Sequence, residues 1–169
     1  MAELENYLIR PYQKGDNKHS FSCGAPHLDH YFSAVLSQDI KRNLAAGYVL
    51  WDDDDMTVAG YFTISSIHIV LDQIPDQYRK KLPYNEVPFL LLGRLAVDQG
   101  YKGRGLGKNL LMSVFELTCR LKAQMGIWGL AVDPIDQEAE KFYSKFDFQK
   151  LPADKRMFIT VQSIEKLFR

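Results

Sequence analysis

The chain has 169 residues, 46% of them apolar, so it is long enough to bury a substantial core in one domain. Its 21 basic and 21 acidic residues balance, which excludes a strong overall field for nucleic acid. Cys23 and Cys119 form neither a disulfide framework nor a metal-ligand spacing. The first residues lack an apolar signal region, and no apolar run is long enough to span a bilayer. We therefore expect a cytoplasmic protein with a single domain, residues 1–169.

The first half of the chain predicts one strand, one or two helices and then two strands. Apolar residues from Leu28 to Ile40 recur at helical spacing, and Gly47 is expected to end this helical segment. Alternating and β-branched residues on either side of Asp52–Asp55 indicate two strands joined by a turn. We interpret this acidic run as a solvated hairpin turn, with a carboxylate metal site as the alternative. The expected strands are 6–12, 48–51 and 58–70.

The second half predicts a long central strand, two main helices and three further strands. The segment 72–88 contains three prolines and is expected to hold a short helix and an extended approach to the central strand. A long helix follows Gly107, and Asp136 is well placed to cap a shorter helix that carries Tyr143. The last two strands are expected to pair in antiparallel fashion around the turn PADKR. The expected strands are 89–97, 127–132, 148–151 and 157–161.

The stretch from Phe89 to Met112 joins the central strand, a glycine-rich basic turn and the start of the long helix. The strand is apolar apart from Arg94, so we expect it to be buried on both faces. At the helix N-terminus several backbone N–H groups lack an intrahelical partner, and the helix dipole is positive there. The glycines of the turn let a ligand approach these N–H groups closely. The turn therefore predicts a site for an anion such as a phosphate or a pyrophosphate.

Spacing distinguishes this turn from two common phosphate-binding loops. The P-loop pattern G-x-x-x-x-G-K-S/T fails because Asn109 follows Gly107-Lys108, and the dinucleotide pattern G-x-G-x-x-G fails because the third glycine arrives one residue early. The remaining pattern, K-G-R-G-L-G at 102–107, resembles the pyrophosphate loop (Q/R)-x-x-G-x-(G/A) of the GNAT superfamily of acetyl-coenzyme A-dependent N-acetyltransferases. Lys102 departs from the Gln or Arg of that pattern but keeps the donor and the charge. A strand-to-helix turn without a ligand is the alternative.

The resemblance extends over most of the chain. The expected order β, α, α, β, β, β, α, β, α, β, β is the GNAT order. The strings FSCGAPHLDHYF at 21–32, LPYNEVPFLLLGRLAVD at 82–98 and KFYSKFDF at 141–148 resemble the acetyltransferase toxins of type II toxin–antitoxin modules. This resemblance implies an α/β (α+β) GNAT fold, in which a mixed, mostly antiparallel central sheet is splayed between its fourth and fifth strands and carries helices on both faces. Asp147 stands where a glycine is usual in the family.

The resemblance also implies a co-substrate site and a catalytic residue. Acetyl-CoA is the implied co-substrate, with its pantetheine arm on backbone groups of the central strand and its pyrophosphate on the glycine loop. Tyr143 matches the family's general acid, because a phenol with a reference pKa of about 10 can protonate a leaving thiolate with a reference pKa of about 8.5. The alternative is that Tyr143 packs in the core with its hydroxyl bonded elsewhere. The implied cofactor-binding residues are Leu95, Ala96, Val97, Lys102, Gly103, Arg104, Gly105, Leu106, Gly107 and Lys108.

No carboxylate occurs between Phe89 and Val97, where many GNAT enzymes carry a base for the incoming amine. An α-amine, with a pKa of about 7.7 to 8, is partly neutral at pH 7. It therefore suits such a site better than a lysine ammonium, whose pKa is about 10.4. This argument and the toxin resemblance both favour acetylation of the α-amino group of aminoacyl-tRNA, which would inhibit translation. The alternatives are a non-toxic N-acetyltransferase for a small-molecule amine or a protein N-terminus, and a CoA-binding regulator without catalysis. Retention of Tyr143 argues against the regulator.

Four basic clusters are candidate contacts for tRNA, because phosphate contacts dominate binding to nucleic acid. The alternative for each cluster is a solvated surface. The toxin resemblance implies a ribbon-helix-helix antitoxin as a further partner, and a homodimer is an assembly to be tested. The four histidines lack metal-ligand spacing, so we expect no metal, and we expect no membrane partner. The basic clusters are Lys41 with Arg42, Arg79 to Lys81, Lys102 with Arg104, and Lys150 with Lys155 and Arg156.

Overall fold

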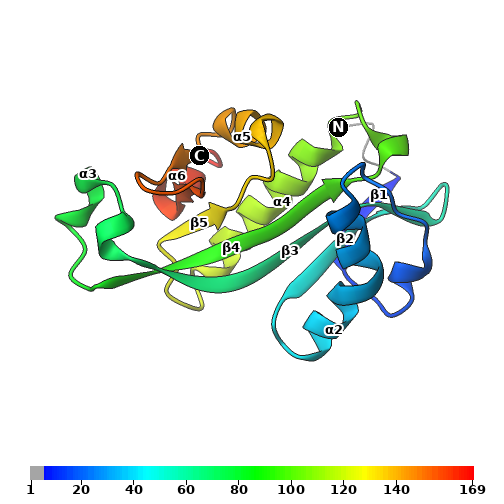
Figure 1. Ribbon diagram of the computed structural model, residues 1–169, viewed down its shortest axis with the longest axis horizontal. Helices are drawn as coiled ribbons and strands as arrows, with labels where there is room; N and C mark the ends of the chain where they lie inside the picture. Colours follow the sequence, from blue (N-terminus) through cyan, green and yellow to red (C-terminus); the bar gives the residue numbers. More distant parts are fainter. Residues whose placement is uncertain (1–5) are drawn as a thin grey trace. The chain divides into compact units, whose positions relative to one another are not determined.

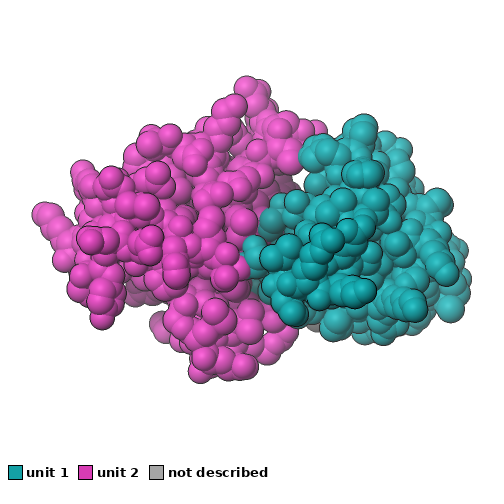
Figure 2. Space-filling view, turned by 60° about the horizontal axis from the view of Figure 1, so that its bottom comes forward, with its two compact units in different colours: residues 1–65, 93–114 teal, residues 66–92, 115–169 magenta. Residues whose placement is uncertain are grey.

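The computed structural model describes residues 6–169, which divide into two compact units (Figure 2). Unit 1 contains the residues up to Ser65 together with Gly93–Val114. Unit 2 contains Ser66–Leu92 and Phe115–Arg169. Each unit is described below by itself, and the expectation of a single domain over residues 1–169 stays a prediction.

The strands form a seven-stranded sheet in the order β1-β2-β3-β4-β5-β7-β6, with helices flanking it (Figure 1). The sheet is mostly antiparallel and contains a parallel β4–β5 pair, which confirms the predicted mixed sheet of an α/β fold. The strands are β1 (Tyr7–Pro11), β2 (Ala46–Asp52), β3 (Thr57–Val70), β4 (Glu86–Val97), β5 (Gly129–Val132), β6 (Gln149–Lys150) and β7 (Met157–Thr160). The helices are α1 (Pro26–His30), α2 (Leu36–Lys41), α3 (Asp76–Arg79), α4 (Leu106–Leu121), α5 (Gln137–Ser144) and α6 (Val161–Lys166).

In unit 1, the segment from α1 to α2 covers one face of the strands. The helix α2 and the strand β2 are in contact. Between the two helices the chain forms a π-helical turn at Tyr31–Val35, a rare conformation that is frequent at functional sites. Apolar side chains of these helices and of the strands below them form one buried cluster: Cys23, Leu28, Tyr31, Phe32, Leu36, Val49, Val58, Tyr61 and Ala96.

The opposite face of the same strands carries the first turns of α4. Gly60 pairs with Leu50. Their neighbours Val49 and Tyr61 belong to the buried cluster described above. Because neighbouring strand residues point to opposite faces, Leu50 and Gly60 face the other side of the strands. A Cβ atom at Gly60 would lie 3.0 Å from Cδ1 of Leu110 and 2.9 Å from the carbonyl oxygen of Ala96. Glycine therefore lets α4 and β4 approach β3 closely at this point, and unit 1 has helices on both faces of its strands.

In unit 2, the first part of β4 pairs with β5 and is packed by aromatic rings. The backbone N–H of Trp128 donates to the carbonyl of Pro88 at 2.8 Å, which brings the chain before β5 against β4. The Trp128 ring lies 5.4 Å from Phe89, 5.3 Å from Tyr78 and 6.1 Å from Phe158, measured between ring centroids. Aromatic pairs at such separations contribute beyond the area that they bury. This cluster holds β4, β5 and β7 together.

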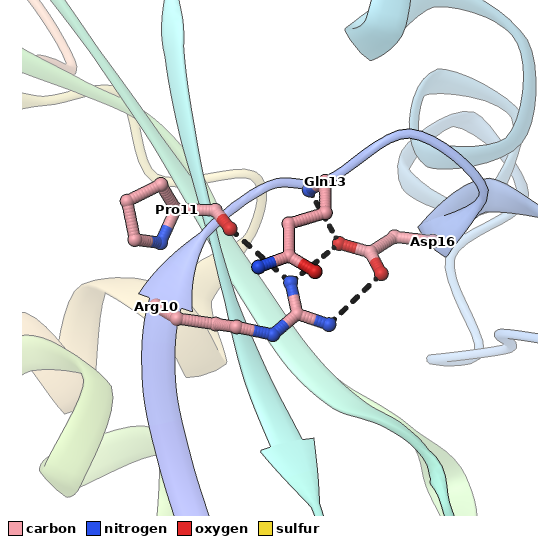
Figure 3. A network of polar contacts seen from close by, with 4 residues as sticks. All are labelled: Arg10, Pro11, Gln13 and Asp16. Carbon is pink, nitrogen blue, oxygen red and sulfur yellow. Dashed lines mark hydrogen bonds and ion pairs between the residues drawn. The ribbon is translucent and has the colours of Figure 1, made fainter.

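The loop after β1 is held by a partly buried ion pair (Figure 3). Nη1 and Nη2 of Arg10 donate to the two carboxylate oxygens of Asp16 at 2.8 and 3.0 Å, and the backbone N–H of Gln13 donates to the same carboxylate at 2.7 Å. Burial alone would raise the pKa of the Asp16 carboxyl, but the bonds from Arg10 and Gln13 hold that pKa below its usual value. The bidentate geometry fixes the path of the loop out of the strand.

The prediction for Gly47 is wrong, because this residue lies inside β2 and does not end the helix before it. The helical segment ends earlier, near Asn43, whose φ of 60° is left-handed. A Cβ atom at Gly47 would lie 3.0 Å from Cδ1 of Leu36 and 3.2 Å from Cδ1 of Ile40. Glycine at position 47 therefore avoids tight contacts with α2, which packs directly on the strand.

Element boundaries differ from the expected ones mainly in unit 2. The strand β4 begins at Glu86, ahead of the expected Phe89, and runs through Pro88. The helix α6 was not expected, although Thr160 caps it by accepting the backbone N–H of Ser163 at 3.1 Å. Among residues 6–169, no helix is long and apolar enough to cross a membrane.

Candidate active site

The glycine loop of unit 1 has the geometry of an open anion site. Gly103 and Gly105 have φ angles of 82° and 74°, in the left-handed region that favours glycine. A Cβ atom at either position would meet no other atom within 4 Å, so the space in front of the loop is open. The helix α4 begins directly after the loop at Leu106, and its first N–H groups lack intrahelical acceptors. The positive end of the helix dipole and the open space therefore lie together at this loop.

A cavity of about 730 Å³ in unit 1 contains this loop. Its size is within the usual range for sites that bind small molecules and cofactors. Glycine-loop and helix residues line one part of it, and the β2–β3 turn lines another. The lining residues include Gly103, Arg104, Gly105, Leu106, Lys108 and Asn109 from the loop and helix, and Asp52, Asp54 and Asp55 from the turn.

The acidic turn beside the loop accepts hydrogen bonds from Tyr101. The hydroxyl of Tyr101 donates to Asp52 at 2.5 Å and to Asp55 at 3.2 Å. Asp52 is only 4% exposed, so the sequence interpretation of the whole run as a solvated turn is wrong for this residue. Within residues 6–169, no group of three or more His, Cys, Asp or Glu side chains that could hold a metal ion is found.

Two of the three basic side chains of the loop, those of Lys102 and Arg104, are already engaged within unit 1. Nζ of Lys102 donates to the carbonyl of Cys23 at 2.8 Å. Nη1 of Arg104 donates to the hydroxyl of Tyr7 at 3.1 Å, and its guanidinium lies 4.8 Å from the centroid of the Tyr101 ring. These interactions leave the backbone N–H groups and the side chain of Lys108, which also lines the cavity, as donors for a ligand. The interactions with Tyr101 and Tyr7 were not foreseen, because no spacing in the sequence links these residues to the loop.

The pairing of β4 with β5 stops before the residues that are expected to hold the pantetheine arm. The register between β4 and β5 runs from Phe89–Gly129 to Leu92–Val132, while β4 itself continues to Val97. Leu95, Ala96 and Val97 therefore lie beyond the last residue pair of β4 with β5. This is the arrangement in which a strand can offer backbone groups to an extended ligand.

Tyr143 lies on α5 in unit 2, where its ring is buried and only 6% of the residue is exposed. The ring packs against Phe142 and Phe148, with centroids 5.1 and 5.2 Å away. Within the described part of the chain, its hydroxyl has no hydrogen-bond partner, and no fully buried side-chain oxygen is left unpaired, so the hydroxyl still reaches solvent. Burial raises the pKa of Tyr143 above its usual value, which keeps the phenol protonated at neutral pH.

The end of α5 holds Tyr143 in place. The carboxylate of Asp136 caps the helix by accepting the backbone N–H of Ala139 at 2.8 Å, as predicted. After the helix, Asp147 has a φ of 69°, so it adopts the left-handed conformation for which the family usually has glycine. The backbone N–H of Phe148 then donates to the carbonyl of Tyr143 at 3.3 Å. The departure at Asp147 therefore preserves the turn.

Comparison with known proteins gives relatives that extend over nearly the whole chain. A family model described as an acetyltransferase (GNAT) domain matches residues 47–150. The chain is 31% identical over 145 residues to a tRNA-acetylating toxin of Mycobacterium tuberculosis, a match that covers 86% of this chain and 86% of that protein. It is 28% identical over 163 residues to a probable toxin TacT of Sinorhizobium fredii, covering 89% of this chain and 90% of the relative.

Solved structures agree with these relatives. A tyrosine-to-phenylalanine mutant of KacT has a TM-score of 0.91 and 27% identity, and the match covers 97% of this chain and 100% of that one. AtaT complexed with acetyl-methionyl-tRNAfMet has a TM-score of 0.88 and 26% identity, covering 96% and 99%. AtaTR bound with acetyl-CoA has a TM-score of 0.84 and 26% identity, covering 98% and 99%. The family match spans more than half of the sequence, and together with the tRNA-acetylating relative it shows that this chain belongs to the GNAT family of acetyltransferases.

Proposed function

We propose that this acetyltransferase transfers acetyl from acetyl-CoA to the α-amino group of aminoacyl-tRNA and thereby acts as a toxin that inhibits translation. The observation that carries the proposal is the tRNA-acetylating relative, which is 31% identical to this chain over 86% of its length. A match of that extent includes both the glycine loop and Tyr143. The structural relative AtaT, solved with acetyl-methionyl-tRNAfMet, supports the same class of acceptor.

Acetyl-CoA is the co-substrate that fits the loop of unit 1. Gly103 and Gly105 leave the space in front of their backbone open, so a pyrophosphate can reach the N–H groups at the start of α4. In the proposal the loop from Lys102 to Lys108 holds the pyrophosphate. Backbone groups of Leu95, Ala96 and Val97 hold the pantetheine arm.

Tyr143 is proposed as the general acid of the reaction. When the amine attacks the thioester, the carbon–sulfur bond breaks and the leaving thiolate needs a proton. A buried phenol whose pKa is raised stays protonated at pH 7 and can donate. Its hydroxyl has no competing partner among residues 6–169, which argues against the alternative that Tyr143 is only a core residue.

The acceptor amine is expected to be partly neutral before it binds, because β4 carries no carboxylate after its exposed first residue, Glu86. The segment from Phe89 to Val97 contains no carboxylate. An α-amine with a pKa of about 7.7 to 8 supplies a useful neutral fraction at pH 7, and the electron-withdrawing ester of aminoacyl-tRNA lowers that pKa further. We propose that the enzyme acts in the cytoplasm, where this acceptor occurs, and that a ribbon-helix-helix antitoxin neutralises it. A homodimer stays a prediction.

Acetyl transfer from radiolabelled acetyl-CoA tests the acceptor directly. The purified chain is incubated with aminoacylated tRNA, with the same tRNA after deacylation, with an amino acid methyl ester and with a peptide that has a free N-terminus. We expect label on the aminoacylated tRNA and none on deacylated tRNA, with the Tyr143→Phe variant as the matched low-activity control. Transfer to the peptide or the ester, with none to aminoacylated tRNA, would favour a non-toxic N-acetyltransferase for protein N-termini or small amines.

A further inference from the structure

Arg94 lies in β4 and stacks on an aromatic ring of the helical segment above the strand. Its guanidinium carbon is 3.4 Å from the centroid of the Tyr31 ring, a close cation–π contact. The side chain is partly buried. It is also the only charged residue between Phe89 and Val97, and the sequence assigns no role to it.

The positive charge of Arg94 has no anionic partner in the part of the chain that the structure describes. Among residues 6–169, neither an ion pair nor a hydrogen bond to its guanidinium is found. The Tyr31 ring does not supply a charge, because burial and the bond to Asp39 raise the pKa of Tyr31 to about 12 and keep the phenol neutral. One face of this guanidinium is covered by the ring, so the N–H donors along its edges are left for a ligand.

The Tyr31 ring that contacts Arg94 is fixed in place. Tyr31 is only 6% exposed and begins the π-helical turn. Its hydroxyl donates to Asp39 at 2.7 Å, and the neighbouring Tyr61 donates to the carbonyl of Leu28 at 2.7 Å. Stacking on such a ring restricts the guanidinium before any ligand arrives, which lowers the entropy cost of binding.

Arg94 is also close to the expected reacting centre. It precedes Leu95, and neighbouring Cα atoms are about 3.8 Å apart. If the pyrophosphate lies on the loop after β4 and the pantetheine arm runs back along the strand from Val97 to Leu95, the thioester end of the arm lies nearest to Arg94. The attacking amine must come within about 3.5 Å of the thioester, so it also lies beside Arg94. This step rests on the proposed function.

We propose that Arg94 is an anion-binding residue of the acceptor site and that it holds a phosphate of the terminal nucleotides of aminoacyl-tRNA. A guanidinium is planar, permanently charged and able to bind a phosphate through two parallel hydrogen bonds. The acceptor end of tRNA carries phosphates near the aminoacyl ester, whereas a simple amino acid ester carries none. Arg94 therefore distinguishes the nucleotide acceptor from other α-amines.

Two variants and two acceptors test this assignment. Arg94→Met keeps most of the side-chain stem over Tyr31 but removes the charge, and Arg94→Lys keeps the charge but removes the planar fork. We expect Arg94→Met to lower kcat/KM on aminoacyl-tRNA by about 10- to 100-fold, the range of a hydrogen bond to a charged group. Arg94→Lys should lower kcat/KM on aminoacyl-tRNA by a smaller factor. Neither variant should change the affinity for acetyl-CoA or kcat/KM on an amino acid methyl ester.

Salt dependence supplies a second measurement that a merely structural role would not change. Removing one neutralised phosphate of a single strand should make the slope of log kcat/KM against log salt less steep by about 0.7 for Arg94→Met and leave it unchanged for Arg94→Lys. Equal reductions in kcat/KM on both acceptors, or an unchanged slope in Arg94→Met, overturn the inference. A wild-type chain that does not acetylate aminoacyl-tRNA overturns the proposed function itself, so the two failures are distinguishable.

Discussion

At the scale of single residues, Tyr143 combines a packed ring with a hydroxyl that has no hydrogen-bond partner among the described residues. Replacing it with phenylalanine keeps the ring packing against Phe142 and Phe148 and removes the proton donor. We expect kcat to fall by about 10² to 10⁴-fold, as general acid catalysis typically contributes. The loss should appear in single-turnover measurements of the chemical step, with the affinity for acetyl-CoA unchanged.

The pH dependence of the wild-type rate gives a second test of Tyr143 as the general acid. Burial raises the pKa of Tyr143 above the ordinary value of 10.0, so the acid stays protonated below that pH. The rate should therefore rise with pH as the acceptor amine loses its proton and should not fall again below about pH 10. A Tyr143→Phe protein that turns over at the wild-type rate would show that water or another group protonates the thiolate.

Gly105 provides the residue-scale test of the glycine loop. Its φ of 74° is unfavourable for a β-branched side chain, and any side chain there projects into the open space where the pyrophosphate is expected. Because the pyrophosphate would be blocked, Gly105→Val should weaken coenzyme A binding, measured by calorimetry, by about tenfold or more. Unchanged affinity in a Gly105→Val protein whose circular dichroism matches the wild type would refute the loop assignment.

How far the site could be predicted differs from residue to residue. The cap at Asp136 and the open glycines follow from local chemistry, because capping and left-handed backbone depend on neighbours in the chain. The hydrogen bond from Lys102 to the carbonyl of Cys23 and the stacking of Arg94 on Tyr31 join residues far apart in sequence. Such pairs leave no spacing pattern, so they become visible only in the folded chain.

At the scale of elements, the Arg10–Asp16 pair gives a testable account of the loop after β1. The folded-state pKa of Asp16 is depressed, so the carboxylate contributes stability above its unfolded pKa of about 3.9, and this contribution is lost as pH falls through the folded pKa. Asp16→Asn should therefore destabilise the protein at pH 7 by about 1 to 3 kcal/mol, the range for hydrogen bonds to a charged group.

Urea denaturation at several pH values measures this effect. The difference between wild type and Asp16→Asn should be largest near neutral pH and should shrink below about pH 4, where the wild-type carboxyl begins to be protonated. Asp154→Asn is the matched control, because Asp154 is exposed. A difference that is equally large at pH 3 and pH 7 would mean that packing rather than charge is responsible.

Most elements were predictable from hydrophobic periodicity, but their ends were not. The strand β4 starts at Glu86 and passes through Pro88, because tertiary pairing near Trp128 overrides the local preference of proline. The last strand was expected to reach Val161, yet Thr160 ends it and caps α6. The apolar residues Val161 and Ile164 fit a strand by composition and a helix by spacing, and in so short a segment the pattern does not decide between them.

At the scale of the whole molecule, basic and acidic residues balance in number, but the basic residues differ in whether they form ion pairs. Three members of the predicted basic clusters form ion pairs: Arg79 with Asp76, Lys150 with Glu140, and Arg156 with Asp133. Such exposed pairs add little stability, but they reduce the local positive field. If the chain acts on aminoacyl-tRNA as proposed, the total of 21 basic against 21 acidic residues leads us to expect that few phosphates are neutralised.

The salt dependence of turnover measures how many phosphates the enzyme neutralises. Each neutralised phosphate makes the slope of log kcat/KM against log salt more negative by about 0.7 to 0.9, because its counterions are released on binding. For an enzyme without a strong overall field we expect a slope of about −2 to −4 on aminoacyl-tRNA and a slope near zero on an amino acid methyl ester.

Charge reversal on the surface separates true tRNA-binding clusters from solvated faces. Lys41→Glu combined with Arg42→Glu removes one predicted cluster in unit 1, and Lys80→Glu combined with Lys81→Glu removes one in unit 2. A cluster that touches tRNA should, when reversed, lower kcat/KM on aminoacyl-tRNA and flatten the salt slope, while the rate on the methyl ester stays constant as the control. If neither double variant changes the slope, phosphate recognition is confined to other residues, and these two clusters are solvated faces.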